Sequence, residues 1–447
     1  MVDDSVKTKV ISEAKKEGVK FIRLQFTDIL GTPKNCAVTI DRLEEVLDEG
    51  LWFDGSSIEG FVRIHESDMI AMPDSSTFRI LPWTVKDKKV ARVICDIEDT
   101  KGKPFKGDPR YALKKMLKEA TDMGYNYYIG PEAEFFLFKT ENGFTTTPEP
   151  QDKAGYFDLD NVDLGTDIRK ETMMVLEEMG IKSECSHHEV AVGQHEIDFV
   201  YQEALSMADT LVTYKYVLKK IASKYGMYAS FMPKPIQGIN GSGMHTHQSL
   251  WRREENAFYD ENGEYNLSDI ARYFVGGQLK HCRNFTAITN SLVNSYKRLI
   301  PGYEAPVYIS WGRRNRSALI RVPSIRKGKK SSARIELRSP DPACNPYLAF
   351  AVMLKAGLDG IKKKIEPPDP VEEDVYHFDD RKLAKFYIKT LPNSLFDALL
   401  ELDKDDVIKE ALGSYICEKF TEAKRAEWES YRQSVSRWEL DTYLPII

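Results

Sequence analysis

Four short segments of the chain alternate between apolar residues and residues with charged or metal-binding side chains. Successive side chains of a β-strand point to opposite faces, so residues i and i+2 lie on one face. Each segment is therefore expected to pack one face on a core and to present carboxylates, imidazoles or guanidiniums on the other. The segments are Pro131–Phe138, Gln194–Phe199, Met244–Leu250 and Ala333–Arg338.

The residue types on these faces differ from those of an ordinary solvent face. A solvent face would carry mobile Lys, Thr and Ser, whereas Glu, His and Arg collect here from four separate strands. Converging carboxylates without a cation would repel one another and shift their pKa values upward. For any one pair, separate salt bridges on sheet faces are the competing interpretation. The four segments together favour a shared site for cations and phosphates.

The pattern elsewhere predicts an α+β chain with a small N-terminal unit. This unit should hold a helix over 6–16, strands over 20–27, 35–40 and 90–97, a short helix capped by Asp41, and turns over 51–80. A linker-like stretch follows, and Asp108-Pro109 is typical of a helix start, with Asp as cap and Pro in the first turn. We place the domain boundary near residue 105, which gives domains 1–105 and 106–447.

The second domain mixes strands with helices. The two are not regularly alternated, so a doubly wound parallel sheet is not favoured. The helices are expected over 110–123, 165–180, 203–225, 268–284, 346–364 and 414–435.

Composition and charge narrow the class of partner. The 447 residues are 42% hydrophobic and 30% charged, which is typical of a folded globular protein. A net charge of −6 argues against nucleic acid or an anionic membrane as the main partner. No run approaches the ~20 apolar residues of a membrane helix, and the first residues lack the blocks of a signal peptide. We expect a cytoplasmic protein whose six cysteines act as small buried hydrophobes.

A group of carboxylates with one imidazole is the main candidate metal site. Two of the carboxylates share a strand face, and two more flank a stretch in which Gly193-Gln194 could turn the chain so that both reach the same space. This oxygen-rich set suits Mg²⁺ or Mn²⁺ rather than zinc or copper. The set is Glu132, Glu134, Glu189, Glu196, His245 and Glu336.

Arginines form a second group, between residues 297 and 338, where basic residues far outnumber acidic ones. Guanidinium forks bind carboxylates and phosphates bidentately. A nucleic-acid patch is the competing interpretation, but aromatic interleaving is thin, so a phosphate and carboxylate clamp is favoured. The usual glycine-rich phosphate loops are missing, so a nucleotide would have to be held through metals and arginines. The arginines are Arg298, Arg316, Arg321 and Arg338.

Loops supply further candidates. Asn240–Gly243 is suited to close backbone approach to a ligand. Asp54 lies in a Gly-Ser turn and Glu304 in a stretch rich in Pro and Gly, so each is a candidate mobile general base. His187 and His188 are candidate supports for the neighbouring metal ligands.

With these residues assembled, the sequence closely resembles type I glutamine synthetases, from about Val19 to the C-terminus. Long motifs occur in the order typical of that family. They are Asp54-Gly-Ser-Ser-Ile-Glu-Gly60, Gly130-Pro-Glu-Ala-Glu134, Ser186-His-His-Glu-Val190, Gly193-Gln-His-Glu196, Asn240-Gly-Ser-Gly-Met-His-Thr-His247, Asn294-Ser-Tyr-Lys-Arg-Leu-Ile-Pro-Gly-Tyr-Glu-Ala-Pro306, Asn315-Arg-Ser317 and Arg334-Ile-Glu-Leu-Arg338.

The resemblance implies an ATP-dependent ligase that joins ammonia to glutamate through a γ-glutamyl phosphate. It also implies two Mg²⁺ or Mn²⁺ ions per active site. Arg316 and the metals would neutralise the transferred phosphoryl group. Asp54 would deprotonate ammonium, and Glu304 would shield the intermediate from water. By the same resemblance, Glu134, Glu189 and Glu196 hold one metal, and Glu132, His245 and Glu336 hold the other.

The remaining site residues also come from the resemblance. Glutamate contacts are expected at Asn240, Gly241, Arg298, Glu304 and Arg338. Nucleotide and phosphate contacts are expected at Glu184, His247, Ser249, Arg316 and Arg321.

The family architecture is an N-terminal β-grasp domain followed by a catalytic domain with a curved antiparallel sheet flanked by helices. The resemblance further implies a dodecamer of two stacked hexameric rings with active sites between subunits, so Asp54 would serve the adjacent chain. Arg63 matches a position linked to glutamine feedback, and a nitrogen-regulatory protein is a candidate partner. The setting of Tyr376 lacks the prolines of the adenylylated subtype, so we expect the shorter subtype without that modification.

Two alternative functions stay open at this point. One is a relative that ligates glutamate to another amine, and the other is a catalytically inactive structural relative.

Overall fold

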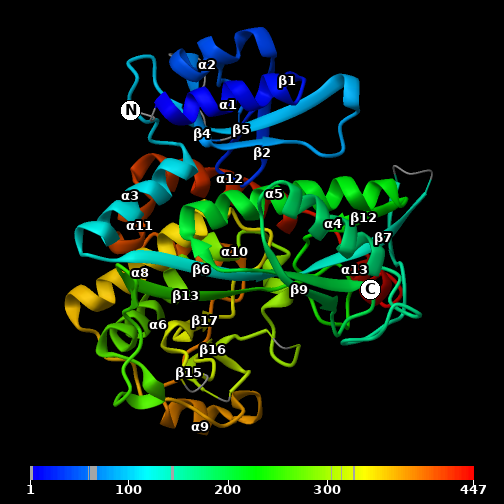
Figure 1. Cartoon of the computed structure of the whole chain (residues 1–447). Coiled ribbons are helices and arrows are strands. Elements are labelled where there is room, and N and C mark those ends of the chain that lie inside the picture. Colours follow the sequence, from blue (N-terminus) through cyan, green and yellow to red (C-terminus); the bar gives the residue numbers. More distant parts are fainter. Residues whose placement is uncertain are drawn as a thin grey trace.

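The computed structural model describes residues 4–58, 60, 68–141, 145–303, 305–313, 315–325 and 328–447. Within them, two β-sheets organise an N-terminal domain and a larger second domain. The N-terminal domain forms a separate lobe at the top of Figure 1, and the second sheet crosses the middle of the molecule below it. The described helices include none that is both long and apolar enough to cross a membrane.

The N-terminal domain has the β-grasp arrangement that the resemblance implied. Its sheet has the order β2-β1-β5-β4-β3, in which β1 and β5 are parallel and the other pairs antiparallel. The helices contribute Val10, Ala14, Val46 and Leu47 to one core with the sheet. The elements are α1 Asp4–Lys16, β1 Val19–Thr27, β2 Pro33–Thr39, α2 Leu43–Glu49, β3 Leu51–Asp54, β4 Asp68–Ile80 and β5 Lys89–Glu98.

Two local expectations for this domain are wrong. Turns were expected up to residue 80, but β4 runs from Asp68 to Ile80. Its register with β5 shifts between Asp74 and Arg79, so the residues between them bulge out of the ladder and give the strand a turn-like composition. Asp41 lies inside a 3₁₀ turn ahead of α2, and no side chain caps either element.

The helices of the second domain follow the predicted pattern. Asp108 caps α3 by accepting from the Arg110 backbone N–H at 2.9 Å, with Pro109 in the first turn. Helix α6 continues to Thr289, five residues past the expected end. The helices are α3 Pro109–Asp122, α4 Thr166–Glu178, α5 Ala204–Lys224, α6 Asp269–Thr289, α7 Ser295–Arg298, α8 Pro346–Lys363, α9 Asp380–Lys385, α10 Leu395–Leu402, α11 Asp406–Leu412, α12 Ser414–Arg432 and α13 Arg437–Tyr443.

The second sheet is curved and mixed. Its main path is β12-β7-β10-β6-β13-β17-β16-β15, and every described pair is antiparallel except β15 with β16. The expected antiparallel sheet is thus confirmed apart from that edge. The strands are β6 Asn126–Ala133, β7 Phe135–Glu141, β8 Thr145–Pro150, β9 Ser183–His188, β10 Gln194–Phe199, β11 Gln202–Glu203, β12 Met227–Ser230, β13 Met244–Arg252, β14 Glu255–Asn256, β15 Tyr308–Gly312, β16 Ala318–Arg321 and β17 Ile335–Leu337.

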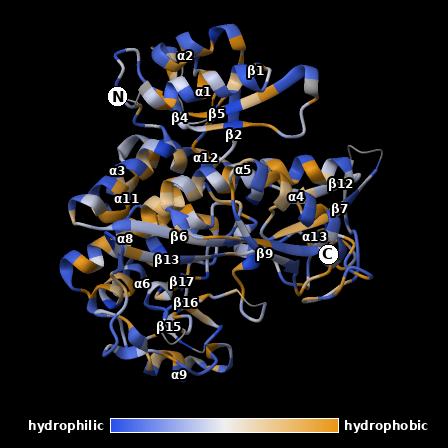
Figure 2. Ribbon diagram, viewed as in Figure 1, coloured by the Kyte–Doolittle hydropathy of each residue, from blue (hydrophilic) through white to orange (hydrophobic). Residues whose placement is uncertain are grey.

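Helices cover one side of this sheet and leave the other side to the loops. The ribbons of α4 and α5 alternate between hydrophobic and hydrophilic residues, as expected for helices with one buried face (Figure 2). Helix α8 is buried from Pro346 to Gly360 and forms part of the same core. Packing this core against one sheet face directs the alternate strand residues to the opposite face, where the candidate site lies.

Candidate active site

Strand register brings the alternating polar side chains into rows across the sheet. Asp198 on β10 pairs with Glu132 on β6, and Glu132 pairs with His245 on β13. On the other edge of β13, His247 pairs with Glu336 on β17. Like charges directly opposite each other destabilise a sheet. The Asp198–Glu132 pair is therefore a position at which a bound cation would be stabilising.

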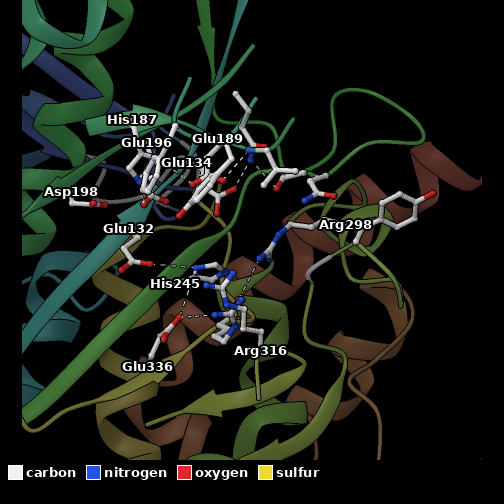
Figure 3. Close-up of a pocket in the computed structure, with 18 of the residues that line it drawn as sticks. Glu132, Glu134, His187, Glu189, Glu196, Asp198, His245, Arg298, Arg316 and Glu336 are labelled. Atoms are coloured by element: carbon white, nitrogen blue, oxygen red, sulfur yellow. Dashed lines mark hydrogen bonds and ion pairs between the residues drawn. The ribbon is translucent and has the colours of Figure 1, made fainter. Parts of the chain in front are cut away.

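These rows line a cavity of about 480 Å³. Figure 3 shows Glu134, Glu189, Glu196 and His187 at one end, with Glu336 at the other. The structure brings twelve of the predicted site residues to this cavity. They are Glu132, Glu134, Glu189, Glu196, Asn240, Gly241, His245, Arg298, Arg316, Arg321, Glu336 and Arg338.

The first carboxylate group is gathered around His187. Its Nδ1 lies 3.5 Å from Glu189 Oε1, and its Nε2 lies 3.4 Å from Glu196 Oε1. The turn predicted at Gly193-Gln194 is present, with the Gln194 N–H donating to the Ala191 carbonyl at 3.0 Å. The turn folds β10 back on β9, and so places both glutamates at one cavity.

Negative charge is crowded in this group. Glu196 is 5% exposed. Burial, together with the charges of Asp198, Glu134 and other carboxylates, raises the pKa of Glu196 well above its ordinary value. Asp198 Oδ1 is buried and has no hydrogen-bond partner among the residues that the structure describes. A divalent cation would relieve this repulsion, so the donor set fits Mg²⁺ or Mn²⁺.

The second group joins Glu132 and Glu336 to the two histidines of β13. His247 Nε2 lies 2.8 Å from Glu132 Oε1, and His245 Nδ1 lies 3.4 Å from Glu132 Oε2. Burial alone would raise the pKa of Glu132, but hydrogen bonds from His245 and His247 hold it well below its ordinary value. Ligand atoms of Glu132, His247 and Glu336 lie within 4.8 Å of one another. In this arrangement His247 approaches the group more closely than His245, whose Nδ1 is 3.9 Å from Glu336 Oε1.

Arginines border the second group. Arg338 Nη1 donates to Glu336 Oε1 at 3.0 Å, while the buried Arg338 Nε has no partner among the described residues. Arg321 Nε lies 3.0 Å from Glu336 Oε2, close enough for an ion pair but not oriented for a hydrogen bond. Arg298 is buried, donates to the Ser339 carbonyl at 2.8 Å, and has its pKa lowered by burial. Arg316 is exposed and also lines the cavity.

Two glycines of the 240–243 loop sit where no larger residue fits. A Cβ on Gly241 would lie 2.1 Å from the Pro233 carbonyl oxygen. A Cβ on Gly243 would lie 2.5 Å from Arg298 Nη2 and 3.2 Å from Glu134 Oε1. The Gly243 N–H donates to Glu134 Oε2 at 2.9 Å. The sequence predicted that the backbone of this loop comes close to a ligand. In the structure, the backbone comes close to side chains of the site.

Several predicted residues lie away from the cavity. Asp54 is exposed at the end of β3 in the N-terminal domain. Glu184 is exposed on β9, and Ser249 is buried on β13 next to Trp251. Glu304 and Arg63 lie outside the described residues.

Sequence reasoning missed several lining residues. Asp198 belonged to an alternating segment but was not assigned a role, and Cys185 was expected to be buried whereas it is exposed. Burial and the hydrogen bond to Asp198 raise the pKa of the Cys185 thiol to about 12. The signal that could have found both is the i, i+2 spacing of Cys185 with His187 and of Glu196 with Asp198. The other missed lining residues are Tyr156, Phe157, Val190, Gln194 and Tyr303, whereas His187, predicted as a support for the metal ligands, lines the cavity itself.

A buried polar network supports the β9–β10 turn from the opposite side. Asp152 Oδ1 accepts from the Gly193 N–H at 3.1 Å and lies 3.1 Å from His188 Nε2. Arg169 pairs with Asp163 at 2.6 Å and approaches His195 Nδ1 at 2.7 Å. These carboxylates and histidines are close enough to suggest a metal site. The guanidinium already supplies the positive charge among them, so the group is a hydrogen-bond network.

Comparison with protein families assigns both domains. Residues 18–100 match the model "Glutamine synthetase, beta-Grasp domain", and residues 106–443 match "Glutamine synthetase, catalytic domain".

Full-length relatives agree with the family models. The chain is 53% identical to a glutamine synthetase of Halobacterium salinarum, covering 97% of this chain and 96% of the relative. It is 53% identical to that of Thermus thermophilus, covering 98% of each. It is 54% identical to that of Thermotoga maritima, covering 96% of this chain and 97% of the relative.

Solved structures share the whole fold. "GmaS/ADP complex-Conformation 1" matches with a TM-score of 0.89 at 32% identity and covers 100% of both chains. A Plasmodium falciparum glutamine synthetase solved by cryo-electron microscopy matches with a TM-score of 0.87 at 27% identity and covers 98% of each chain. Both domains, nearly the full length of the sequence and the fold agree, so this chain belongs to the glutamine synthetase family.

Proposed function

We propose that the cavity carries out the reaction of this family, the ATP-dependent ligation of ammonia to glutamate, in two steps through a γ-glutamyl phosphate. The γ-phosphoryl group of ATP would pass to the glutamate side chain, and ammonia would then displace phosphate to give glutamine. The observation that carries the proposal is the set of facing rows, in which two carboxylate groups and several arginines line one cavity. A phosphoryl transfer site needs this combination of cation ligands and fixed positive charge.

The two carboxylate groups are assigned to two divalent cations. Glu134, Glu189 and Glu196 would hold one, and Glu132, His245 and Glu336 the other. His247, whose Nε2 lies 2.8 Å from Glu132 Oε1, adjoins the second group. Bound Mg²⁺ or Mn²⁺ supplies charge neutralisation for the phosphate oxygens. This assignment is supported by the crowding of carboxylates around Glu196 and by Asp198 Oδ1, which has no hydrogen-bond partner in the described part of the chain.

The arginines and the glycine loop are assigned to the substrates. Arg298, Arg338, Asn240 and Gly241 would bind glutamate. Arg298 is anchored on the Ser339 carbonyl, and its burial favours pairing with a carboxylate. Arg316, exposed at the cavity, is free to swing toward a transferred phosphoryl group. The nucleotide contacts would be His247, Ser249, Arg321 and Glu184, and the similarity to a GmaS/ADP complex supports a nucleotide in this cleft.

The proton-transfer roles are assigned to Asp54 and Glu304. Asp54 would deprotonate ammonium, and Glu304 would shield the acyl phosphate from water. All lining residues of the cavity come from the second domain, whereas Asp54 lies exposed on β3. The site is completed if Asp54 comes from an adjacent chain.

A ring assembly supplies such a neighbour. Trp52 is 57% exposed beside Asp54, and Phe157 is 60% exposed at the cavity edge. Contact between these two surfaces in adjacent chains would bury both aromatic rings. We assign the assembly to a homo-dodecamer of two stacked hexamers, the arrangement that the family resemblance implies.

A comparison of amines tests the function directly. The purified protein is supplied with glutamate, MgATP and either ammonium, methylamine or a polyamine, and the amide product is identified by mass spectrometry. We expect glutamine from ammonium at a kcat/KM well above that for either other amine. A preference for a larger amine would replace the proposal with a related ligase, and no product with any amine would identify an inactive relative.

A further inference from the structure

A second kind of metal-binding group adjoins the first carboxylate group. Cys185 and His187 are two residues apart on β9, and Glu196 and Asp198 are two residues apart on β10. The register pairs Glu196 with His187, so all four side chains point to one face of neighbouring strands. Cys185 therefore sits next to Asp198.

Three of the four residues offer ligand atoms at distances that suit a single ion, and Cys185 adjoins one of them. Cys185 Sγ lies 2.8 Å from Asp198 Oδ2, and His187 Nε2 lies 3.4 Å from Glu196 Oε1. Ligand atoms of His187, Glu196 and Asp198 all lie within 4.8 Å of one another. Asp198 Oδ1 is buried without a hydrogen-bond partner, and Glu196 is 5% exposed. The group thus contains one buried acceptor oxygen, Asp198 Oδ1, that no described donor satisfies.

The ligand types of this group favour a cation other than the Mg²⁺ assigned to the neighbouring carboxylates. Mg²⁺ prefers oxygen ligands in octahedral geometry. One sulfur, one imidazole nitrogen and carboxylate oxygens are instead typical of tetrahedral Zn²⁺. A coordinated thiol loses its proton to solvent, because the metal charge stabilises the thiolate.

We propose that Cys185, His187, Glu196 and Asp198 form a binding site for Zn²⁺, or another thiophilic divalent cation, that competes with the catalytic metals for Glu196. Binding does not depend on the proposed function. The inhibitory effect does, because it arises from withdrawal of Glu196 from the magnesium group.

The site has its own access from outside the substrate cavity. Cys185 and His187 also line a neighbouring hollow of about 460 Å³, bounded by Phe157, Asp160 and Asp163. Cys185 is exposed, so an ion can reach the thiol while substrates occupy the main cavity. Inhibition is therefore expected even with ATP and glutamate bound.

Cobalt spectroscopy tests binding independently of turnover. Co²⁺ is added to the assembled wild-type protein and to its Cys185→Ser and Cys36→Ser variants, and the near-ultraviolet thiolate-to-cobalt charge-transfer band is recorded. Cys36 is a matched control because it is a partly exposed thiol on β2, in the other domain. We expect the band, abolished by added Zn²⁺, in the wild type and Cys36→Ser, and none in Cys185→Ser. A wild type without the band, or a Cys185→Ser variant that keeps it, would overturn the site.

Inhibition assays then test the competition for Glu196. Glutamine formation is measured at saturating Mg²⁺ with increasing Zn²⁺ buffered by a chelator. The half-inhibitory Zn²⁺ concentration, with each protein normalised to its own rate without Zn²⁺, should rise about tenfold or more in Cys185→Ser. If the wild type shows the cobalt band but the wild type and Cys185→Ser are equally sensitive to Zn²⁺, the proposed competition for Glu196 would be refuted. Absence of glutamine formation in the wild type would count against the proposed function, whatever the cobalt spectra show.

Discussion

At the residue scale, Gly243 leaves no space in the site for a larger side chain. Its N–H binds Glu134, and the space that a side chain would need is filled by Arg298 and Glu134. Arg298 is in turn held by backbone carbonyls, so it cannot retreat without breaking hydrogen bonds. One glycine thereby fixes the spacing between a proposed metal ligand and a proposed glutamate contact.

Gly243→Ala is expected to damage turnover far more than stability. The added Cβ must displace Arg298 or Glu134, and a displacement of about 1 Å in a reacting assembly lowers the rate roughly 100-fold. We expect a fall of that size in kcat/KM for glutamate. Gly155→Ala is the control, because a Cβ there would meet nothing closer than 3.8 Å. Equal kinetics in the two variants would contradict the assigned role of the loop.

Most of the candidate site residues were predictable at the residue scale because the alternation of side chains along a strand is visible in the sequence. Glu132, Glu134, Glu196, His245 and Glu336 were found from i, i+2 spacing alone. Cys185 and Asp198 share this spacing with His187 and Glu196 but were not assigned to the site, and their proximity to each other depends on how β9 pairs with β10. That register includes an irregularity between Ile197 and Phe199, which no local pattern reveals.

Among the structural elements, α3 forms the polar link between the two domains. Arg110 at its start is 3% exposed and pairs with Asp74 on β4, Asp96 on β5 and Asp209 on α5, at 2.7 to 2.9 Å. One buried guanidinium therefore compensates carboxylates from both domains. Removing it would leave these carboxylates without their common partner.

Arg110→Met is expected to lower the free energy of unfolding by about 3–5 kcal/mol, the usual effect of breaking a buried ion pair. The midpoint of urea denaturation measures it. Lys118→Met on the same helix is the control, because its ion pair with Asp122 is exposed and such pairs contribute about 0–1 kcal/mol. Similar midpoints for both variants would show that Arg110 does not stabilise the domain contact.

The same cluster predicts a pH dependence. Burial alone would raise the pKa of Asp74, but the charge of Arg110 holds it below its ordinary value. A carboxyl with a lowered pKa stabilises the fold above its unfolded pKa, and the stabilisation is lost as pH falls through the folded value. The difference in stability between wild type and Arg110→Met should therefore shrink as the pH is lowered below about 4. A difference that is constant down to pH 2 would contradict this origin.

Element boundaries show where sequence patterns succeed and fail. The helices α3, α5 and α8 were predicted closely because their caps and apolar periodicity are local. Strand β4 was missed because its bulge between Asp74 and Arg79 has the composition of a turn. At the bulge, the Thr77 hydroxyl accepts from the Ile94 N–H at 2.7 Å in place of a backbone carbonyl of β4. Such a side-chain substitute for a strand hydrogen bond cannot be predicted from the sequence.

For the whole molecule, the central structural point is that Asp54 lies apart from the cavity that gathers most of the other proposed site residues. The cavity is lined by the second domain, and Asp54 lies on the exposed edge of the first. Strand order and domain placement are global properties, so alternation in the sequence indicated a shared cation site without indicating how many chains build it.

Mixed assemblies test whether the site is shared. Asp54→Asn and Glu336→Ala are each expected to be inactive, and they are co-expressed with different tags so that hybrid particles can be isolated. Random mixing in a closed ring restores about one quarter of the sites, because each needs Asp54 from one chain and Glu336 from the next. If Asp54 served its own chain, hybrids would be no more active than the parents.

The number of Mn²⁺ ions bound per chain tests most directly the claim that two carboxylate groups hold two cations. Mn²⁺ is titrated into wild type, Glu196→Gln and Glu336→Gln, and free Mn²⁺ is measured by electron paramagnetic resonance. We predict two tightly bound ions in the wild type and one in each variant, because each substitution removes a charged ligand from a different group. Two tightly bound ions in both variants, or a wild type that binds none, would contradict the account.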